Sequence, residues 1–308
     1  MPTEPVLTAF DVPVARQSSR SSVSLSDYWA LTKPEVNFLI VITTFAGFYL
    51  GYSPLSGSFP FVRLINALVG TLLVASGTGT LNQYIERDFD AQMRRTSRRP
   101  LAAGRLKPSR VLWFGVTVSA LGGIYLALAV NVLASLLAIF TLLSYLFVYT
   151  PLKRKTPFSV LVGAIPGAMP PLIGWAAANG SHNLEAWTLY AILFFWQFPH
   201  FMAIAWMYRE DYARAGYLVL PPDDYVRARL VNWQTVLPLL ALVPVSLLPG
   251  LIGEAKFYLI GALFLNVGFL YYAVQFVLRR SNSAARRLLA ASIIYLPALS
   301  AMMILRRG

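Results

Sequence analysis

Long apolar runs separated by short charged segments dominate this chain of 308 residues. Each run is close to the roughly 17 to 25 residues with which a helix crosses a bilayer. The pattern predicts an all-α fold, a multi-pass transmembrane helical bundle with about nine transmembrane helices. The runs fall near residues 36–53, 62–83, 111–130, 132–149, 158–178, 187–207, 234–253, 256–278 and 288–305.

The composition favours the same fold class. Hydrophobic residues make up 57% of the chain and charged residues 13%, whereas a soluble domain usually carries about 25% charged residues. Cysteine is absent, which excludes disulfides and thiolate metal sites. We interpret the chain as an integral membrane protein whose transmembrane domain occupies residues 27–308.

The first 26 residues differ in character from the rest. They are polar and rich in serine, and they lack the apolar core of a signal peptide. Glu4 and Asp11 also argue against a transit peptide, because such peptides are poor in acids. We expect residues 1–26 to be a disordered cytoplasmic tail.

Lysine and arginine are concentrated on one side of the predicted membrane domain. If the N-terminus shares a side with the gaps after the second, fourth, sixth and eighth runs, that side holds 22 of the 26 basic residues. The positive-inside rule then places the N-terminus in the cytoplasm. Topology also explains the formal charge of +13, so no nucleic-acid partner is expected.

The segment NQYIERDFDAQMRRTSRRP follows the second run and holds three acids and five arginines. Asn82, Glu86, Asp90 and Arg94 are spaced four apart, so on a helix they share one face, whereas Asp88 points elsewhere. An amide and two carboxylates are oxygen ligands that suit Mg²⁺ bound with a substrate phosphate. The nearby arginines could bind the same phosphates. A solvated, salt-bridged helix end explains the spacing equally well.

Two later runs contain residues that are unusual in lipid. Pro199 in the sixth run is expected to bend or break its helix, and His200 beside it needs a partner or a cavity if it lies in hydrocarbon. A lone histidine is nevertheless more often structural. In the fifth run, Gly163 and Gly167 have GxxxG spacing, which indicates close helix packing. The prolines of GAIPGAMPPLIGW indicate irregular backbone lining a cavity.

Several motifs together resemble one family. The pattern Asn82-x-x-x-Glu86-x-x-x-Asp90, followed by RRTSRRP, resembles the first acidic motif of the UbiA-type intramembrane prenyltransferases. Within that family, the chain is similar to the branch that farnesylates protoheme IX. The segments that carry this second resemblance are ERDFDAQMRRTSRRPLAAG, YTPLKRKTP, GAIPGAMPPLIGWAA, WQFPHF and DYARAGYLVLP.

The resemblance implies a nine-helix bundle around a central cavity, with its reacting groups under a cytoplasmic cap. It implies transfer of a farnesyl group from farnesyl diphosphate to a vinyl group of haem b, giving haem O and diphosphate. Mg²⁺ would be held on the diphosphate by Asn82, Glu86 and Asp90. Haem b is then a substrate, and His200 is the residue expected to contact it.

The resemblance also assigns basic residues to the diphosphate. Arg94, Lys153 and Arg154 would take up the charge that develops as the allylic C–O bond breaks, and Arg98 and Arg99 would bind the same group. Asp211 marks the second acidic motif and is counted with the catalytic residues.

The chain departs from the family pattern at three positions. Gln83 follows Asn82 where the family often has Asp, and Glu86 stands where Asp is commoner. Ala215 replaces the second acid of the second motif, four residues after Asp211. The number of Mg²⁺ ions that bind, one or two, therefore stays open.

Other functions stay open on the sequence alone. The nearest is a prenyltransferase of the same family that acts on a quinone precursor or a lipid; a multi-pass transporter and a haem-binding assembly factor without catalysis are the others. The expected location is a bacterial inner membrane, with the mitochondrial inner membrane as the alternative. Whether the chain associates with a haem A synthase or with terminal oxidase assembly is a question the resemblance raises and leaves open.

Overall fold

The computed structural model describes residues 24–53, 57–253 and 255–306. Almost all of the tail predicted over residues 1–26 lies outside these residues. The described residues form helices and connecting turns, with no strand. Nine of the helices in this part of the chain are long and apolar enough to cross a membrane.

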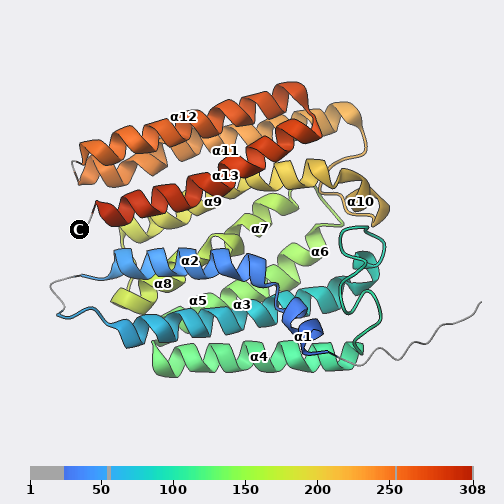
Figure 1. Cartoon of the computed structure of the whole chain (residues 1–308), viewed down its shortest axis with the longest axis horizontal. Helices are drawn as coiled ribbons and strands as arrows, with labels where there is room; N and C mark the ends of the chain where they lie inside the picture. The colour runs from blue at the N-terminus through green and yellow to red at the C-terminus, as the bar shows by residue number, and fades with distance from the viewer. Residues whose placement is uncertain (1–23, 54–56, 254, 307–308) are drawn as a thin grey trace, which may run out of the picture.

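The nine membrane-spanning helices lie side by side in one bundle (Figure 1). Two short helices, α1 (Leu25–Leu31) and α10 (Arg209–Arg214), lie at one end of it. The spanning helices are α2 (Pro34–Gly51), α3 (Phe61–Asp90), α4 (Pro108–Ala129), α5 (Val132–Leu143) continued by the π-helical η2 (Ser144–Tyr149) and by α6 (Thr150–Leu152), α7 (Ser159–Gly167) with α8 (Met169–Asn179), α9 (Leu184–Met207), α11 (Asp224–Ile252), α12 (Lys256–Arg279) and α13 (Asn282–Leu305).

Every predicted apolar run is confirmed as helical, and three helices, α3, α11 and α13, extend well beyond their runs. Helix α3 continues through a polar segment to Asp90, because the backbone hydrogen bonds of a helix do not require apolar side chains. Helix α11 begins at residue 224, where the Asp223 side chain accepts a hydrogen bond from the Val226 amide. Such a cap satisfies a backbone donor that would otherwise lack a partner.

The pair α7 and α8 forms the most deeply buried of the nine spans in the described chain. The helix is interrupted at Ala168, between Pro166 and the prolines of α8. A Cβ added to Gly174 would lie 2.0 Å from the Thr44 carbonyl oxygen of α2, so the two backbones are in direct contact. The close packing predicted at Gly163 and Gly167 is confirmed, because a Cβ there would lie 2.5 Å from Tyr149 Cε2 and 2.3 Å from Gln197 Oε1, respectively. The irregular backbone predicted for this run is confirmed at Ala168.

One end of the bundle gathers the polar segments (Figure 1). The end of α3, the connection from α6 to α7, α10 and the turn from α12 to α13 all lie on the right of the view, together with α1. These are the segments that carry most of the basic residues of the described chain. The grouping of segments on which the predicted topology rests is therefore present in the fold.

Candidate active site

A cavity of about 580 Å³ lies inside the bundle and joins the polar end to the apolar interior. Helices α2, α3, α7 and α9 and the π-helical η2 contribute to its wall. Its polar part is lined by Lys33, Asn82, Glu86, Asp90, Arg99 and Lys153. Its apolar part includes Ile40, Val74, Ile173, Leu193, Phe201 and Leu296, and His200 lies on the same wall.

The last two turns of α3 bring the predicted amide and carboxylates to this cavity. Asn82, Glu86 and Asp90 are only 1%, 6% and 1% exposed, and all three line the cavity. The Asn82 amide Nδ2 donates a hydrogen bond to Glu86 Oε2 at 2.9 Å. Asp88 points away, with 74% of its side chain exposed. The stripe formed by Asn82, Glu86 and Asp90 is therefore a buried polar cluster and not a solvated helix end.

Each member of the stripe is paired with a cation from another part of the chain. Lys33 Nζ lies 2.7 Å from Asn82 Oδ1, and Lys153 Nζ lies 2.9 Å from Glu86 Oε1. Arg99 Nη1 lies 2.7 Å from Asp90 Oδ2. Lys153 and Arg99 balance the two carboxylates, and Lys33, when protonated, adds a positive charge at the polar end of the cavity. Such a site favours an anionic ligand.

The buried position of the two lysines affects their protonation in opposite directions. Burial, reinforced by the charge of Arg99, lowers the pKa of Lys33 to about 7. Burial also opposes the charge on Lys153, but Glu86 and Tyr149 outweigh it and raise the Lys153 pKa well above its usual value. Lys153 is therefore a permanent cation at neutral pH, whereas the charge of Lys33 depends on what anion lies nearby.

Aromatic rings surround the Lys153 ammonium. Its Nζ lies 4.7 Å from the centre of the Tyr149 ring and 5.9 Å and 6.0 Å from those of Tyr217 and Tyr145. Gly163 makes room for this arrangement, because a Cβ there would lie 2.5 Å from Tyr149 Cε2. Burial and the charge of Glu86 raise the pKa of Tyr217, so its hydroxyl keeps its proton. The cage holds the ammonium in place through cation–π contacts.

Four of the predicted site residues do not line the cavity. The helical stripe was expected to continue to Arg94, which is wrong because α3 ends at Asp90 and Arg94 is exposed in the turns that follow. Arg98 and Arg154 are also exposed, and the Arg154 guanidinium stacks 4.2 Å over the Phe89 ring. Asp211, the fourth, is buried away from the cavity wall.

Asp211 holds the segment that closes the polar end of the site. Its Oδ2 accepts a hydrogen bond from the Arg95 amide at 3.1 Å, and its Oδ1 lies 3.2 Å from Arg214 Nη1. Arg95 itself lines the cavity. The second acidic motif thus positions the arginine segment that follows α3.

The sequence did not identify Lys33 or the tyrosines around Lys153 as site residues. It also did not distinguish Arg95 from the neighbouring arginines. From the sequence, Lys33 is expected to lie at the membrane interface. Its neighbours in the chain give no indication that it pairs with Asn82, 49 positions away. Its backbone is in the left-handed region, with φ of 54°, immediately before Pro34 begins α2. That turn directs the chain from α1 into α2 above the cavity. The feature of the sequence that distinguishes Lys33 is its position immediately before Pro34, the proline that begins α2.

One hydrogen bond and one stacked ring fix the orientation of the His200 imidazole. Its Nδ1 lies 2.8 Å from Ser292 Oγ, and the Trp196 ring stacks on the imidazole at 4.7 Å. The Ser292 hydroxyl donates its proton to the Leu289 carbonyl at 2.6 Å, so it can only accept from His200. Nδ1 therefore carries the proton, and Nε2 keeps its lone pair. Helix α9 also continues unbroken through Pro199, so a break there, one of the two effects expected of it, does not occur.

The oxygen atoms at the polar end fit Mg²⁺ shared with a phosphate. No group of three or more His, Cys, Asp or Glu residues suited to a metal occurs in the described part of the chain. Glu86, Asp90 and the Asn82 amide form a smaller set, and Asp90 Oδ1 is buried with no hydrogen-bond partner. Mg²⁺ is commonly bound by one or two carboxylates together with substrate phosphates. The donor set suits that arrangement and not a cage built from protein ligands alone.

Known proteins with similar sequences cover almost the whole chain. Residues 40–296 match the UbiA prenyltransferase family. A protoheme IX farnesyltransferase of Solibacter usitatus is 49% identical over 293 residues, which cover 92% of this chain and 99% of the relative. A protoheme IX farnesyltransferase of Salinibacter ruber is 42% identical, with coverage of 91% and 98%.

Solved structures of low sequence identity share the fold. A digeranylgeranylglyceryl phosphate synthase superimposes with a TM-score of 0.72 at 17% identity, covering 91% of this chain and 97% of that one. A UbiA homologue from Archaeoglobus fulgidus bound to GPP and Mg²⁺ gives 0.61 at 18% identity, with coverage of 90% and 99%. The predicted all-α transmembrane fold is confirmed by this likeness and by the nine helices of the described chain.

Proposed function

The chain belongs to the UbiA prenyltransferase family, and we propose that it transfers a farnesyl group from farnesyl diphosphate to a vinyl group of haem b. The products are haem O and diphosphate. The observation that carries this proposal is that one cavity has both a cluster of carboxylates paired with cations at one end and an apolar chamber with His200 at the other. The names of the sequence relatives support the identity of the two substrates.

The polar end of the cavity is the proposed diphosphate site. Asn82, Glu86 and Asp90 would hold Mg²⁺, which when bound neutralises charge on the leaving diphosphate. Displacement of Lys33 and Arg99 from the stripe toward phosphate oxygens would free the Asn82 and Asp90 oxygens that these cations now occupy. The support for this is Asp90 Oδ1, a buried acceptor without a partner that points to a missing ligand.

The cations around the stripe would stabilise the charge that develops as the allylic C–O bond breaks. Lys153 is fixed by Glu86 and its aromatic cage, and Arg95 and Arg99 line the same wall. Removal of one such preorganised donor typically costs about 3–4 kcal/mol of transition-state stabilisation. For the exposed residues Arg94, Arg98 and Arg154 we propose long-range attraction of the diphosphate without direct contact.

The apolar part of the cavity is the proposed chamber for the farnesyl chain and the haem. Its walls exclude water from the allylic cation until the vinyl carbon attacks. The product hydroxyl then requires one water molecule to enter. His200 would contact the haem through Nε2, the ring nitrogen that the bond from Nδ1 to Ser292 leaves with a lone pair. A nitrogen with a free lone pair would suit contact with the haem iron.

The reaction would take place at the cytoplasmic side of a bacterial inner membrane. The basic segments gather at the same end of the bundle as the stripe (Figure 1), and basic residues favour the cytoplasmic side. The N-terminus would then be cytoplasmic. Association with a haem A synthase or with terminal oxidase assembly is compatible with a membrane location. Co-purification would test it.

The proposal is tested with the purified full chain in lipid nanodiscs. Farnesyl diphosphate, haem b and Mg²⁺ are added, and the haem is extracted for mass spectrometry. The expected result is haem of the mass of haem O, formed in step with released diphosphate. Prenylation of an aromatic acid or a lipid, with haem unchanged, would instead assign the chain to another acceptor within the same family.

A further inference from the structure

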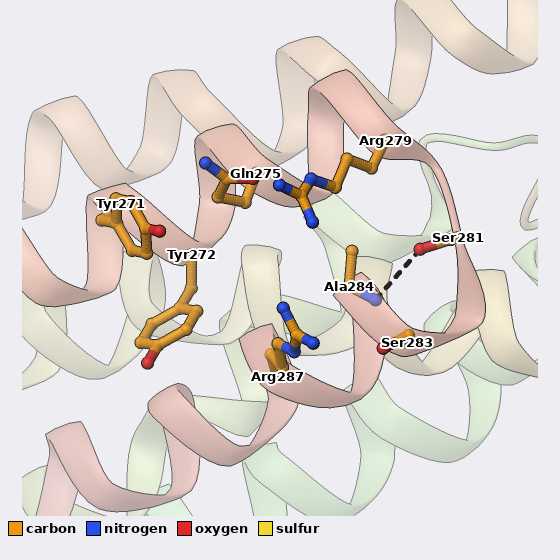
Figure 2. A pocket seen from close by; sticks show the side chains of 8 residues that line it. All are labelled: Tyr271, Tyr272, Gln275, Arg279, Ser281, Ser283, Ala284 and Arg287. Atoms are coloured by element: carbon orange, nitrogen blue, oxygen red, sulfur yellow. Dashed lines mark hydrogen bonds between the residues drawn. The ribbon is translucent and has the colours of Figure 1, made fainter.

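A second pocket, of about 300 Å³, lies where α12 turns into α13 (Figure 2). It shares no lining residue with the active-site cavity. Helix α12 contributes Tyr271, Gln275 and Arg279, and the first turns of α13 contribute Ser283 and Arg287. The turn from α12 to α13, whose residues line part of the pocket, lies at the polar end of the bundle (Figure 1). The ends of membrane-spanning helices lie in the headgroup region of a bilayer.

The turn beside this pocket carries positive charge that forms no ion pair with an acidic residue of the described chain. Arg279, Arg280, Arg286 and Arg287 fall within nine residues, and the chain contains no Asp or Glu after Glu254. None of the four forms an ion pair in the part of the chain that the structure describes. Elsewhere at the same end, Arg99 pairs with Asp90, and similar pairs hold Arg105 and Arg214. The α12–α13 turn is therefore a site of uncompensated charge.

Two of these arginines face into the pocket and two do not. Figure 2 shows the Arg279 and Arg287 guanidinium groups pointing toward each other across the space between the helices. Both line the pocket, whereas Arg280 and Arg286 do not. Guanidinium groups match phosphate oxygens in bidentate geometry, and the Tyr272, Gln275 and Ser283 side chains add further donors.

On the side of the pocket away from the α12–α13 turn, α12 has an exposed, largely apolar face. Phe264 is 79% exposed, Val267 60% and Tyr271 58%. These residues recur at the helical spacing that places them on the same face as Gln275 and Arg279. This face of α12 thus passes from apolar side chains to Tyr271 and then to Arg279, which faces Arg287 of α13 across the pocket. That sequence of chemistries matches an acyl chain, an ester region and a phosphate group.

We propose that this pocket binds the phosphate headgroup of an anionic phospholipid, with the acyl chains lying along α12. Basic pockets between transmembrane helices at the positive side of the membrane bind such headgroups. All four arginines are exposed. A folded acidic protein would engage Arg280 and Arg286 as well, while the headgroup requires only the pair that lines the pocket. The inference does not depend on the acceptor substrate of the enzyme, because the pocket is separate from the active-site cavity.

The experiment compares two double variants of the full chain that carry the same change of charge. Arg279→Gln with Arg287→Gln removes the inward pair, and Arg280→Gln with Arg286→Gln is the matched control on the same turn. Each protein is purified in detergent and titrated with palmitoyl-oleoyl phosphatidylglycerol or with the zwitterionic phosphatidylcholine. Bound lipid is counted by native mass spectrometry, and the melting temperature is recorded with each lipid.

We expect the wild-type chain to retain phosphatidylglycerol in preference to phosphatidylcholine and to melt at a higher temperature with it. The inward double variant should bind phosphatidylglycerol about 25-fold more weakly, at about fivefold per arginine, while the control variant should stay within about threefold. Inorganic phosphate at 10-fold excess over lipid should not compete, because it lacks the acyl chains that α12 accommodates. A wild-type chain that binds both lipids equally, or inorganic phosphate that displaces the lipid, would overturn the proposal.

Equal weakening in both double variants would mean that the turn attracts anions only by its total charge, and it too would overturn the pocket assignment. Folding of the inward variant is checked by its melting temperature in phosphatidylcholine and by haem farnesylation. If the glutamine variant does not fold, Arg279→Lys with Arg287→Lys provides the second test. Lysine keeps the charge but loses the bidentate geometry, so preference for phosphatidylglycerol should fall with no change of net charge.

Discussion

Lys153 Nζ lies 2.9 Å from Glu86 Oε1 and joins two segments that are 67 positions apart in the chain. The side chains are 13% and 7% exposed, so the pair is almost entirely removed from water. The contact ties the last turn of α3 to the segment after α6. Both residues also line the active-site cavity, so the same pair connects folding with the proposed diphosphate chemistry.

Breaking this pair from one side should be more damaging than removing it altogether. Lys153→Met leaves the Glu86 carboxylate buried without its partner, and such a loss typically destabilises a protein by about 3–5 kcal/mol. The double variant Glu86→Gln with Lys153→Met should recover part of that stability, although it should remain inactive. Thermal unfolding in detergent measures both, and Lys155→Met, an exposed neighbour, is the control. Additive losses in the double variant would contradict the pairing.

Asp90 and Asp88 allow a matched comparison within one helix. Asp90 is buried at the cavity, and Asp88 is exposed two residues away. Asp90→Asn should lower turnover by at least about 100-fold and leave haem binding largely intact, whereas Asp88→Asn should stay within about twofold. Haem O formation and the haem absorption spectrum are the two measurements. Equal loss of haem binding and turnover in folded Asp90→Asn would mean that the stripe is structural.

Glu86→Gln should respond to the Mg²⁺ concentration if the carboxylate is a metal ligand. Removal of one ligand weakens the metal site, so a higher concentration of Mg²⁺ should restore part of the rate by mass action. The measurement is haem O formation over a Mg²⁺ titration, with wild type and Asp88→Asn alongside. A Mg²⁺ dependence in Glu86→Gln identical to that of wild type would exclude a ligand role for this side chain.

Ser292 should act on haem through His200. Ser292→Ala removes the acceptor that holds the proton on Nδ1, and loss of such a partner typically costs about 10–100-fold in metal affinity. We expect weaker haem binding and a shifted Soret band, with the KM for farnesyl diphosphate unchanged. The control is Ser300→Ala on the same helix, whose hydroxyl bonds only the Leu296 carbonyl. An unchanged spectrum in Ser292→Ala would argue against His200 as an iron contact.

Gly174 and Gly268 should differ sharply in their tolerance of a methyl group. A Cβ at Gly174 would lie 2.0 Å from the Thr44 carbonyl oxygen and 2.8 Å from the Phe48 amide nitrogen, both backbone atoms of α2. Gly174→Ala should therefore destabilise the protein by about 1–3 kcal/mol or more through overpacking. Gly268→Ala on α12 meets nothing within 4 Å and should be neutral or slightly stabilising. Melting temperatures of the two variants in the same detergent decide the comparison.

The helical fold could be predicted from the sequence because the bilayer leaves few alternatives. A backbone in hydrocarbon must satisfy its own hydrogen bonds, so each apolar run of sufficient length becomes a helix. The stripe of Asn82, Glu86 and Asp90 was predictable for a similar reason, since helical periodicity is local. The family motifs then identified the chemistry. Periodicity gave no indication that α3 ends at Asp90, and the expectation for Arg94 was wrong for that reason.

The partners of the stripe were decided only by the tertiary structure. Lys33 reaches Asn82 across 49 positions, Lys153 reaches Glu86 across 67, and Ser292 reaches His200 across 92. Contacts of this kind depend on how whole helices pack, and the residues around each partner carry no local pattern that records them. The amino-acid sequence therefore determined which residues supply the amide and carboxylate oxygens at the polar end of the cavity. The packing of the helices determined which cations oppose them, and so where the site has room for an anion.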